Sequence, residues 1–285
     1  MANLKEIRNR IASVSSTMQI TSAMKMVSAA KLKKAQDAIT AMRPYSRKLT
    51  ELMQNLSASS QDSNLGVYAD NRPVKRALVV AITSNRGLCG AFNSNVIKKA
   101  KNLQQDWQGV ETDFYTIGKR GTDSLKKIQK PIGVQTTIFD SLTFENTASI
   151  ADELMQLFSN GTCDKIVLIY NSFKNAANQE VLTEQFLPIL PIATDAKTEV
   201  DYIFEPEKED ILSSLIPKSL KTQLYKALRD SFASEHGARM TAMHKATDNA
   251  TELRSQLKIT YNKARQAAIT NEILEIVSGA EALNG

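Results

Sequence analysis

Residues 243–264 read MHKATDNATELRSQLKITYNKA, and this stretch decides the fold class. Its apolar and small residues alternate at spacings of three and four, as in a coiled-coil helix; they are Met243, Ala246, Ala250, Leu253, Leu257, Thr260 and Ala264. The spacing returns in a shifted register at Ile269, Ile273, Ile276, Ala280 and Leu283. Only Pro217 and Gly237 could interrupt a helix between Glu209 and Ser278. At about 1.5 Å per residue, a helix from Lys218 to Leu283 is roughly 100 Å long.

A stripe of this length needs a partner helix of similar length, and residues 3–58 supply one. One face of that segment carries Leu4, Ile7, Ile11, Val14 and Met18, and no glycine or proline interrupts it before Pro44. Both stripes are rich in Ala, Met and Thr, which bury little apolar area. We therefore expect a slender coiled coil built from the two ends of the chain. The longer C-terminal helix is expected to protrude as a single helix.

The middle of the chain has a different pattern, in which short apolar runs alternate with helical segments. The expected strands are Ala77–Thr83, Thr112–Ile117, Val134–Phe139, Lys165–Tyr170, Gln179–Leu187 and Tyr202–Phe204, and the expected helices are Ala91–Gln105, Thr122–Gln129 and Ile150–Phe158. This alternation predicts a parallel sheet with helical crossovers, that is, an α/β (Rossmann-like) domain inserted between the terminal helices. The predicted domains are residues 1–58 and 207–285 (coiled coil), 59–73 (linker) and 74–206 (α/β).

Charge is distributed unevenly over the 285 residues, whose net charge is +6. Residues 1–48 hold ten Lys or Arg against two acidic residues, whereas residues 266–285 hold no Lys or Arg. A basic segment favours acidic partners. No apolar run is long enough to span a bilayer, and the first ten residues lack the apolar core of a secretory signal. The spacing of Cys89 and Cys163 fits neither a metal site nor a redox pair, so we expect reduced thiols in a cytosol-facing protein.

No catalytic, cofactor-binding or metal site is predicted. The turn SNRGLCG at residues 84–90 follows a strand and precedes a helix, where α/β folds place phosphate loops. It lacks the spacing of a known phosphate-binding motif, and a glycine-assisted turn with a buried Cys89 or a protein-contact surface is an alternative. His236 and His244 are expected to be surface or interface residues, since no cysteine or carboxylate pattern accompanies them.

Several long motifs resemble one known family. They are IRNRIASV at 7–14, TMQITSAMKMVSAAKL at 17–32, SNRGLCGAFN at 84–93, SEHGARMTAMHKATDNA at 234–250 and YNKARQAAITNEILEIVSGAEAL at 261–283. Together they are similar to the gamma subunit of F-type rotary ATP synthases. The match covers both ends and the first α/β turn, whereas residues 94–200 carry little signature.

The resemblance implies an antiparallel coiled-coil shaft inside a ring of three alpha and three beta subunits. It places the α/β domain below that ring, against the epsilon subunit and the membrane rotor ring. Proton flow turns the rotor ring and the shaft, which drives the beta subunits through their catalytic states. The resemblance implies no catalytic residue and no cofactor in this chain, no nucleic-acid partner, and membrane attachment only through partners. Because no transit peptide is visible, we expect the cytoplasmic face of a bacterial plasma membrane, with a processed organellar protein as the alternative.

The resemblance also assigns contact residues, motif by motif. Contacts with beta subunits are expected at Met24, Lys25, Glu235, Arg239, Arg265, Gln266, Thr270 and Glu272. The end of the last helix, with Ile273, Ile276 and Leu283, is expected to fit a hydrophobic sleeve at the top of the ring. Tyr202, Phe204 and Glu205 match the segment that meets epsilon and the rotor ring. Many relatives have Asp where this chain has Asn85, so no charge contact is assigned there.

Two other functions compete with the shaft. A basic coiled coil that binds nucleic acid would use residues 1–48, but it leaves the apolar C-terminal end unexplained. A nucleotide-using enzyme built on the turn at residues 84–90 would need a phosphate-binding motif and a base, and the sequence offers neither.

Overall fold

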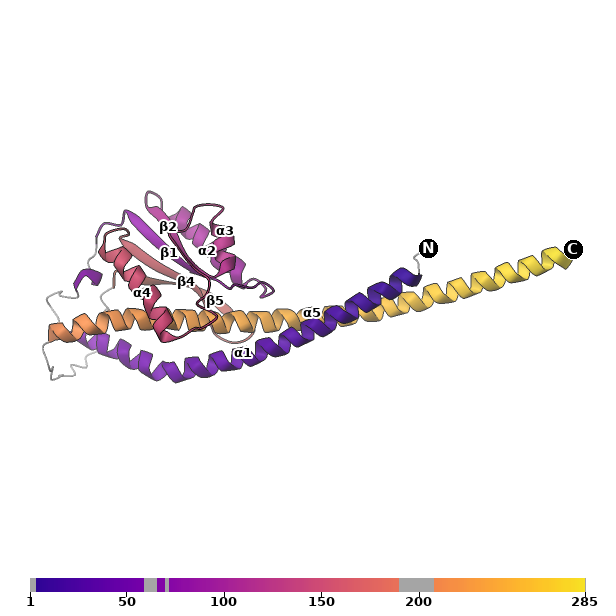
Figure 1. Ribbon diagram of the computed structural model, residues 1–285, viewed down its shortest axis with the longest axis horizontal. Coiled ribbons are helices and arrows are strands. Elements are labelled where there is room, and N and C mark those ends of the chain that lie inside the picture. The colour runs from indigo at the N-terminus through magenta and orange to yellow at the C-terminus, as the bar shows by residue number, and fades with distance from the viewer. Residues whose placement is uncertain (1–3, 59–65, 70–71, 190–207, 285) are drawn as a thin grey trace. The chain divides into compact units, whose positions relative to one another are not determined.

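The computed structural model describes residues 4–58, 66–69, 72–189 and 208–284 (Figure 1). They form two compact units. One contains residues 29–239, and the other contains residues 1–28 and 240–285. Helices α1 (Leu4–Ala58) and α5 (Lys208–Asn284) each contribute to both units. α1 ends and α5 begins within a residue of the predicted boundaries, although the domain limits themselves stay a prediction.

The unit of residues 29–239 is built on a five-stranded sheet in the order β3-β2-β1-β4-β5. The strands are β1 (Arg76–Ile82), β2 (Glu111–Ile117), β3 (Gly133–Gln135), β4 (Lys165–Phe173) and β5 (Gln179–Leu187). The first four are parallel, and β5 pairs antiparallel with β4. Because β1 lies between β2 and β4, the order of the strands reverses beside it. α/β proteins commonly bind ligands at such a point.

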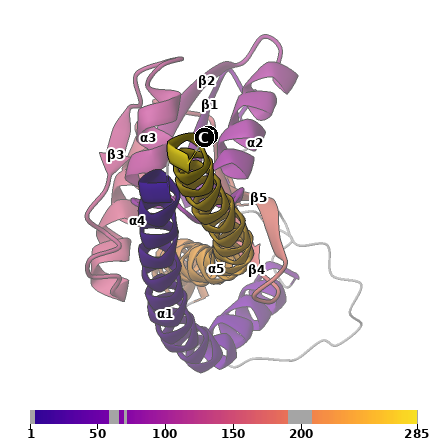
Figure 2. The same cartoon turned by 90° about the vertical axis from the view of Figure 1, so that its right-hand side faces the viewer.

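Helices cover both faces of this sheet (Figures 1 and 2). On one face, Val79 and Ala81 of β1 pack with α2 (Phe92–Asp106) and α3 (Lys119–Leu125). On the other, their neighbours in β1 pack with α4 (Phe144–Ser159) and with residues Ile216–Leu228 of α5. Successive strand residues point to opposite faces, so a strand such as β1, which is apolar at every position after Arg76, requires this double cover. The predicted α/β class is confirmed.

α1 and α5 run antiparallel in the unit of residues 1–28 and 240–285, as their side-chain contacts show. The contacts are Arg8 Nη2 to Tyr261 Oη (3.2 Å), Thr251 Oγ1 to Met18 Sδ (3.3 Å), Thr21 Oγ1 with Thr247 Oγ1 (2.8 Å) and Lys25 Nζ with His244 Nδ1 (3.4 Å). The partners move toward the start of α5 as the contacts advance along α1. This agrees with the predicted antiparallel coiled coil.

The predicted stripe on α5 is wrong at two positions in that unit. Leu253 and Thr260 are exposed, whereas Arg254 and Tyr261 are half-buried. The face of α5 that meets α1 includes hydroxyl groups, and Tyr261 accepts a hydrogen bond from Arg8 there. We call this contact between α1 and α5 the seam. A stripe chosen for hydrophobicity missed the polar residues of the seam.

Three predicted elements differ in the α/β region. β3 covers only Gly133–Gln135, because the chain turns after it with a hydrogen bond from Asp140 N to Thr137 O. α3 begins at Lys119 instead of Thr122, directly after Gly118, whose φ is 101°. α4 begins at Phe144, because Thr143 caps it by accepting from the N–H of Asn146.

The predicted strand Tyr202–Phe204 lies outside the described residues. In the ranges that the structure describes, no helix is long and apolar enough to cross a membrane.

Candidate functional site

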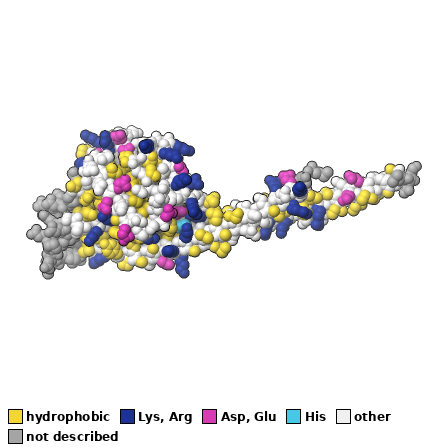
Figure 3. Space-filling view, viewed as in Figure 1, with side chains coloured by type: hydrophobic (Ala, Val, Ile, Leu, Met, Phe, Trp, Pro, Cys, Tyr) yellow, Lys and Arg dark blue, Asp and Glu magenta, His cyan; other side chains and the backbone are white. Residues whose placement is uncertain are grey.

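The first candidate site is the C-terminal end of α5, where every residue from Arg265 to Ala282 is exposed. The bulky apolar residues there form what we call the apolar tip: Ile269, Ile273, Leu274, Ile276 and Val277, with 48–67% of each exposed. No Lys or Arg follows Arg265. Figure 3 shows hydrophobic side chains together with acidic ones toward this end of α5. Such a concentration of exposed Ile and Val on one helix is typical of a surface that a partner covers.

Other residues assigned by the resemblance lie on the same exposed stretch. Arg265, Gln266, Thr270 and Glu272 are all exposed, and Thr270 Oγ1 bonds only to the Gln266 carbonyl one helical turn earlier, at 3.0 Å. Met24 and Lys25 are half-buried on α1. The side chain of Leu283 and the residues Tyr202, Phe204 and Glu205 lie outside the described parts of the chain.

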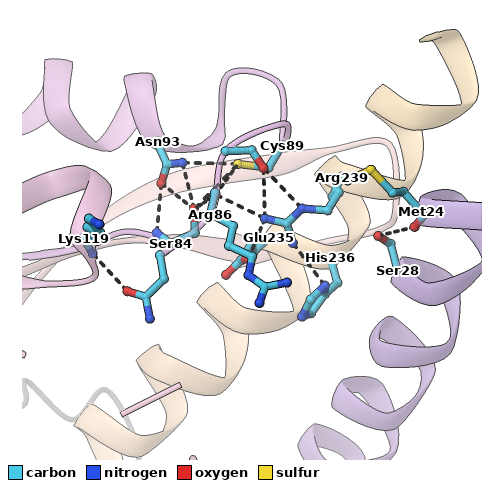
Figure 4. A network of polar contacts seen from close by, with 12 residues as sticks. Met24, Ser28, Ser84, Arg86, Cys89, Asn93, Lys119, Glu235, His236 and Arg239 are labelled. Atoms are coloured by element: carbon cyan, nitrogen blue, oxygen red, sulfur yellow. Dashed lines mark hydrogen bonds and ion pairs between the residues drawn. The ribbon is translucent and has the colours of Figure 1, made fainter. Parts of the chain in front are cut away.

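The second candidate site is the turn at residues 84–90, between β1 and α2 (Figure 4). The Ser84 N–H donates to Asn93 Oδ1 at 2.9 Å, and Ser84 Oγ donates to the Arg86 carbonyl at 2.6 Å. Asn93 Nδ2 bonds Cys89 Sγ at 3.2 Å. Leu88 is 64% exposed and has a φ of 63°, a conformation that costs a residue other than glycine some backbone strain.

Glu235 and Arg239 of α5 form a buried ion pair against this turn, and we call the two side chains the clamp. Arg239 Nη2 lies 2.7 Å from Glu235 Oε1, and each residue is 7% exposed. The same guanidinium group donates to the Arg86 carbonyl at 3.2 Å and to the Gly87 carbonyl at 3.3 and 3.4 Å. Figure 4 shows Arg239 reaching from α5 toward the turn. The turn thus presents carbonyl oxygens to a cation.

That geometry does not support the phosphate-loop alternative. A phosphate loop directs backbone N–H groups at an anion, whereas this turn directs carbonyl oxygens at Arg239. The place beside it is also filled by α5, since Ala238 packs with Cys89 and Phe92. Cys89 is buried, as the alternative of a structural turn predicted. Across the described residues, no group of three or more His, Cys, Asp or Glu is placed to hold a metal ion.

His236 is buried, which corrects the prediction of a surface or interface histidine. It is 5% exposed, and the ring of Phe232 meets it edge-on with centroids 4.5 Å apart. Arg239 Nη1 lies 3.4 Å from His236 Nδ1, so the ring proton is expected on Nε2, where no described group accepts it. Burial, followed by the charges of Arg239 and Lys31, lowers the pKa of His236 to about 4. The ring is therefore neutral at physiological pH.

Burial also acts on the other titratable groups of the site. It raises the pKa of Glu235, and the Arg239 charge opposes that rise. It raises the pKa of the Cys89 thiol as well. An ionised Glu235 is tolerated there because Arg239 pairs with it.

Sequence reasoning singled out Glu235 and Arg239 but not their immediate partners. The structure joins them to each other and to the chain's own turn. No motif in the sequence indicates that carbonyl oxygens of residues 86 and 87 accept from Arg239. The Thr21–Thr247 contact in the seam was missed for a similar reason, since threonines carry no strong signal for pairing. Whether Glu235 and Arg239 also touch a beta subunit stays a prediction.

These features define the class of the chain: a coiled-coil protein with an inserted α/β domain, whose longer helix α5 ends in an exposed apolar tip. A sequence profile of the family described as ATP synthase matches residues 3–283. The chain therefore belongs to the ATP synthase gamma-chain family, as its relatives agree. It is 71% identical to the ATP synthase gamma chain of Flavobacterium johnsoniae and 45% identical to that of a Geobacter species, with full coverage of all chains.

Solved structures agree with the fold. A chain from the central stalk/c-ring structure of the Tetrahymena thermophila mitochondrial ATP synthase superposes with a TM-score of 0.64 at 26% identity, covering 80% of this chain and 99% of that one. A chain of the Euglena gracilis mitochondrial enzyme gives 0.74 at 23% identity, covering 98% and 94%. The gamma chain is a central-stalk subunit with a rotary coupling role, and catalysis occurs on other subunits of the complex.

Proposed function

We propose that this chain is the rotating shaft inside a ring of three alpha and three beta subunits, driven by ion flow through a membrane rotor ring. The ATP sites belong to the beta subunits. The foot of the shaft contacts the epsilon subunit and the rotor ring, and the complex lies on the cytoplasmic face of a bacterial plasma membrane. The chain itself reaches the membrane only through these partners.

The apolar tip carries this proposal. A single helix that exposes five bulky apolar side chains and no Lys or Arg is unfavourable in water unless a partner covers it. A hydrophobic sleeve formed by the ring would cover it without fixing it, because apolar contacts have little directional preference. A shaft that turns needs such a bearing.

The exposed polar residues below and beside the tip are proposed to transmit force. Arg265, Gln266, Thr270 and Glu272 contact beta subunits, as Met24 and Lys25 do on α1. Exposed charge pairs are each worth only about 0–1 kcal/mol, so they exchange readily as the shaft turns. Rotation couples to catalysis because an asymmetric shaft makes different contacts with each beta subunit. Ile273, Ile276 and Leu283 contact the sleeve, and Tyr202, Phe204 and Glu205 contact epsilon and the rotor ring.

Immunoprecipitation of the untagged chain from solubilised membranes, followed by an ATPase assay, tests the proposal. Recovery of alpha and beta subunits with ion-linked ATPase activity supports it. Deletion of Glu272–Gly285 is then expected to weaken assembly or torque while the α/β domain remains folded. Recovery of the chain alone or with nucleic acid refutes the shaft, and normal coupling by the truncated chain refutes the bearing role of the tip.

A further inference from the structure

We propose that Arg239 is a positioning residue that locks α5 to the α/β domain, so that torque on the helix is delivered to that domain through the clamp. The inference rests on the rotary function proposed above. It concerns the contact between α5 and the turn at residues 84–90, and it assigns Glu235 and Arg239 a role within the chain.

Arg239 makes a contact of unusual breadth for one side chain. Its guanidinium group donates to two successive peptide carbonyls, those of Arg86 and Gly87, while it pairs with Glu235. Arginine presents its N–H groups in a rigid planar fork, so these bonds fix the orientation of the turn relative to α5 as well as its distance from the helix. Both side chains of the ion pair are about nine-tenths buried, which protects the contact from exchange with water.

Neighbouring residues of α5 secure the same end of the sheet. Ser234 Oγ donates to the Asn171 carbonyl in β4 at 3.0 Å, and Asn171 Nδ2 donates to the Phe92 carbonyl at 3.2 Å. Ala238 packs on Cys89 and Phe92. One turn of α5 therefore holds the carboxyl ends of β1 and β4 together, at the point where the strand order reverses.

The rest of α5 contacts the sheet mainly through apolar side chains between Ile216 and Leu228. Gln223 adds a hydrogen bond to Glu184 of β5, and Arg229 donates to the Leu142 carbonyl just before α4. Apolar packing has little directional preference and resists sliding weakly compared with a fork of charged hydrogen bonds. Arg239 is also the last residue of its compact unit, and Met240 begins the other. Of the polar contacts between α5 and the α/β region that are described above, the clamp therefore lies nearest to the part of α5 that belongs to the other unit.

The strained backbone of the turn agrees with a mechanical role. Leu88 keeps its positive φ of 63° although its side chain is 64% exposed and makes little packing contact. Unfavourable backbone conformations persist where surrounding contacts over-determine them. Here Arg239 and Ser84 both bond the Arg86 carbonyl, and Cys89, the residue after Leu88, is buried against Phe92 and Ala238.

The test measures ion pumped per ATP hydrolysed by the complete enzyme in proteoliposomes, together with the melting temperature of the isolated chain. Arg239→Met removes the fork but leaves a buried carboxylate. The double variant Glu235→Leu with Arg239→Met removes both charges and restores apolar packing. Arg72→Met is the matched control, because Arg72 likewise donates to a backbone carbonyl, that of Phe158 at the end of α4.

We expect R239M to lower the pumping ratio at least threefold and to lower the melting temperature. The double variant is expected to recover the melting temperature but not the ratio, and Arg239→Lys to restore the ratio in part. R72M is expected to lower the melting temperature without changing the ratio. The proposed role of the clamp is refuted if R239M pumps normally, if the double variant recovers the pumping ratio along with stability, or if R72M lowers the ratio equally. Failure of the wild-type chain to assemble into a pumping enzyme would instead refute the shaft itself.

Discussion

Shortening the side chains of the apolar tip to alanine should weaken binding of the chain to the ring of alpha and beta subunits. The size of the loss follows from how much of each side chain is exposed. Ile273 is 54% exposed and Ile276 is 67% exposed. Replacing both by alanine removes the carbon atoms beyond Cβ, which are worth about 0.8 kcal/mol each when fully buried. Only the exposed part of these side chains, about three fifths, can still be covered by a sleeve. The double variant should therefore lose about 3 kcal/mol of binding free energy, which is roughly a 100-fold weaker association.

The assay is titration of the chain into a preformed ring of alpha and beta subunits, with the recovered ATPase activity as readout. Alanine favours helix, so the isolated variant should keep its helix content by circular dichroism. The matched control replaces Ile128 and Ile132, which are 47% and 46% exposed in the α/β region, by alanine. It should associate normally. Wild-type affinity of the tip variant would refute the reasoning, as would an equal loss in the control.

Three further predictions concern the α/β region, whose Trp107 is the chain's single tryptophan and reports unfolding. Gly118→Ala should lower the free energy of unfolding in urea by about 2–4 kcal/mol, because Gly118 has a φ of 101° and an added Cβ would meet the Thr83 carbonyl. The control Gly109→Ala, which has open space around it, should cost only about 1 kcal/mol. The pKa of His236 lies at about 4 in the folded chain against 6.5 in a free side chain, so protons favour the unfolded state and stability should fall as the pH drops from 6.5 toward 4. His236→Gln should remove roughly 3 kcal/mol of that dependence, and identical pH profiles would contradict it. Burial raises the pKa of Cys89 and raises that of Cys163 to about 12, so neither thiol should react with a disulfide reagent at pH 8 until the chain unfolds; rapid labelling of the native chain would contradict the burial.

The sequence by itself determined the architecture. Its long uninterrupted helical periods needed a long partner helix, and only the other end of the chain offered one. Alternating apolar runs and helices required a doubly covered sheet, because strands as apolar as β1 cannot face water. The exposed tip was also foreseeable, since α5 exceeds α1 in length and its end has no Lys or Arg.

Only the tertiary structure decided which side chains meet. Arg254 and Tyr261 are half-buried where Leu253 and Thr260 were expected, because the rotation of a helix depends on its partner's side chains as well as on its own. The clamp was equally hidden, since Arg239 bonds carbonyl oxygens about 150 residues earlier in the chain, and every residue carries a carbonyl. Periodicity is a local property that the sequence records, whereas a buried contact between distant segments exists only once folding has placed them together.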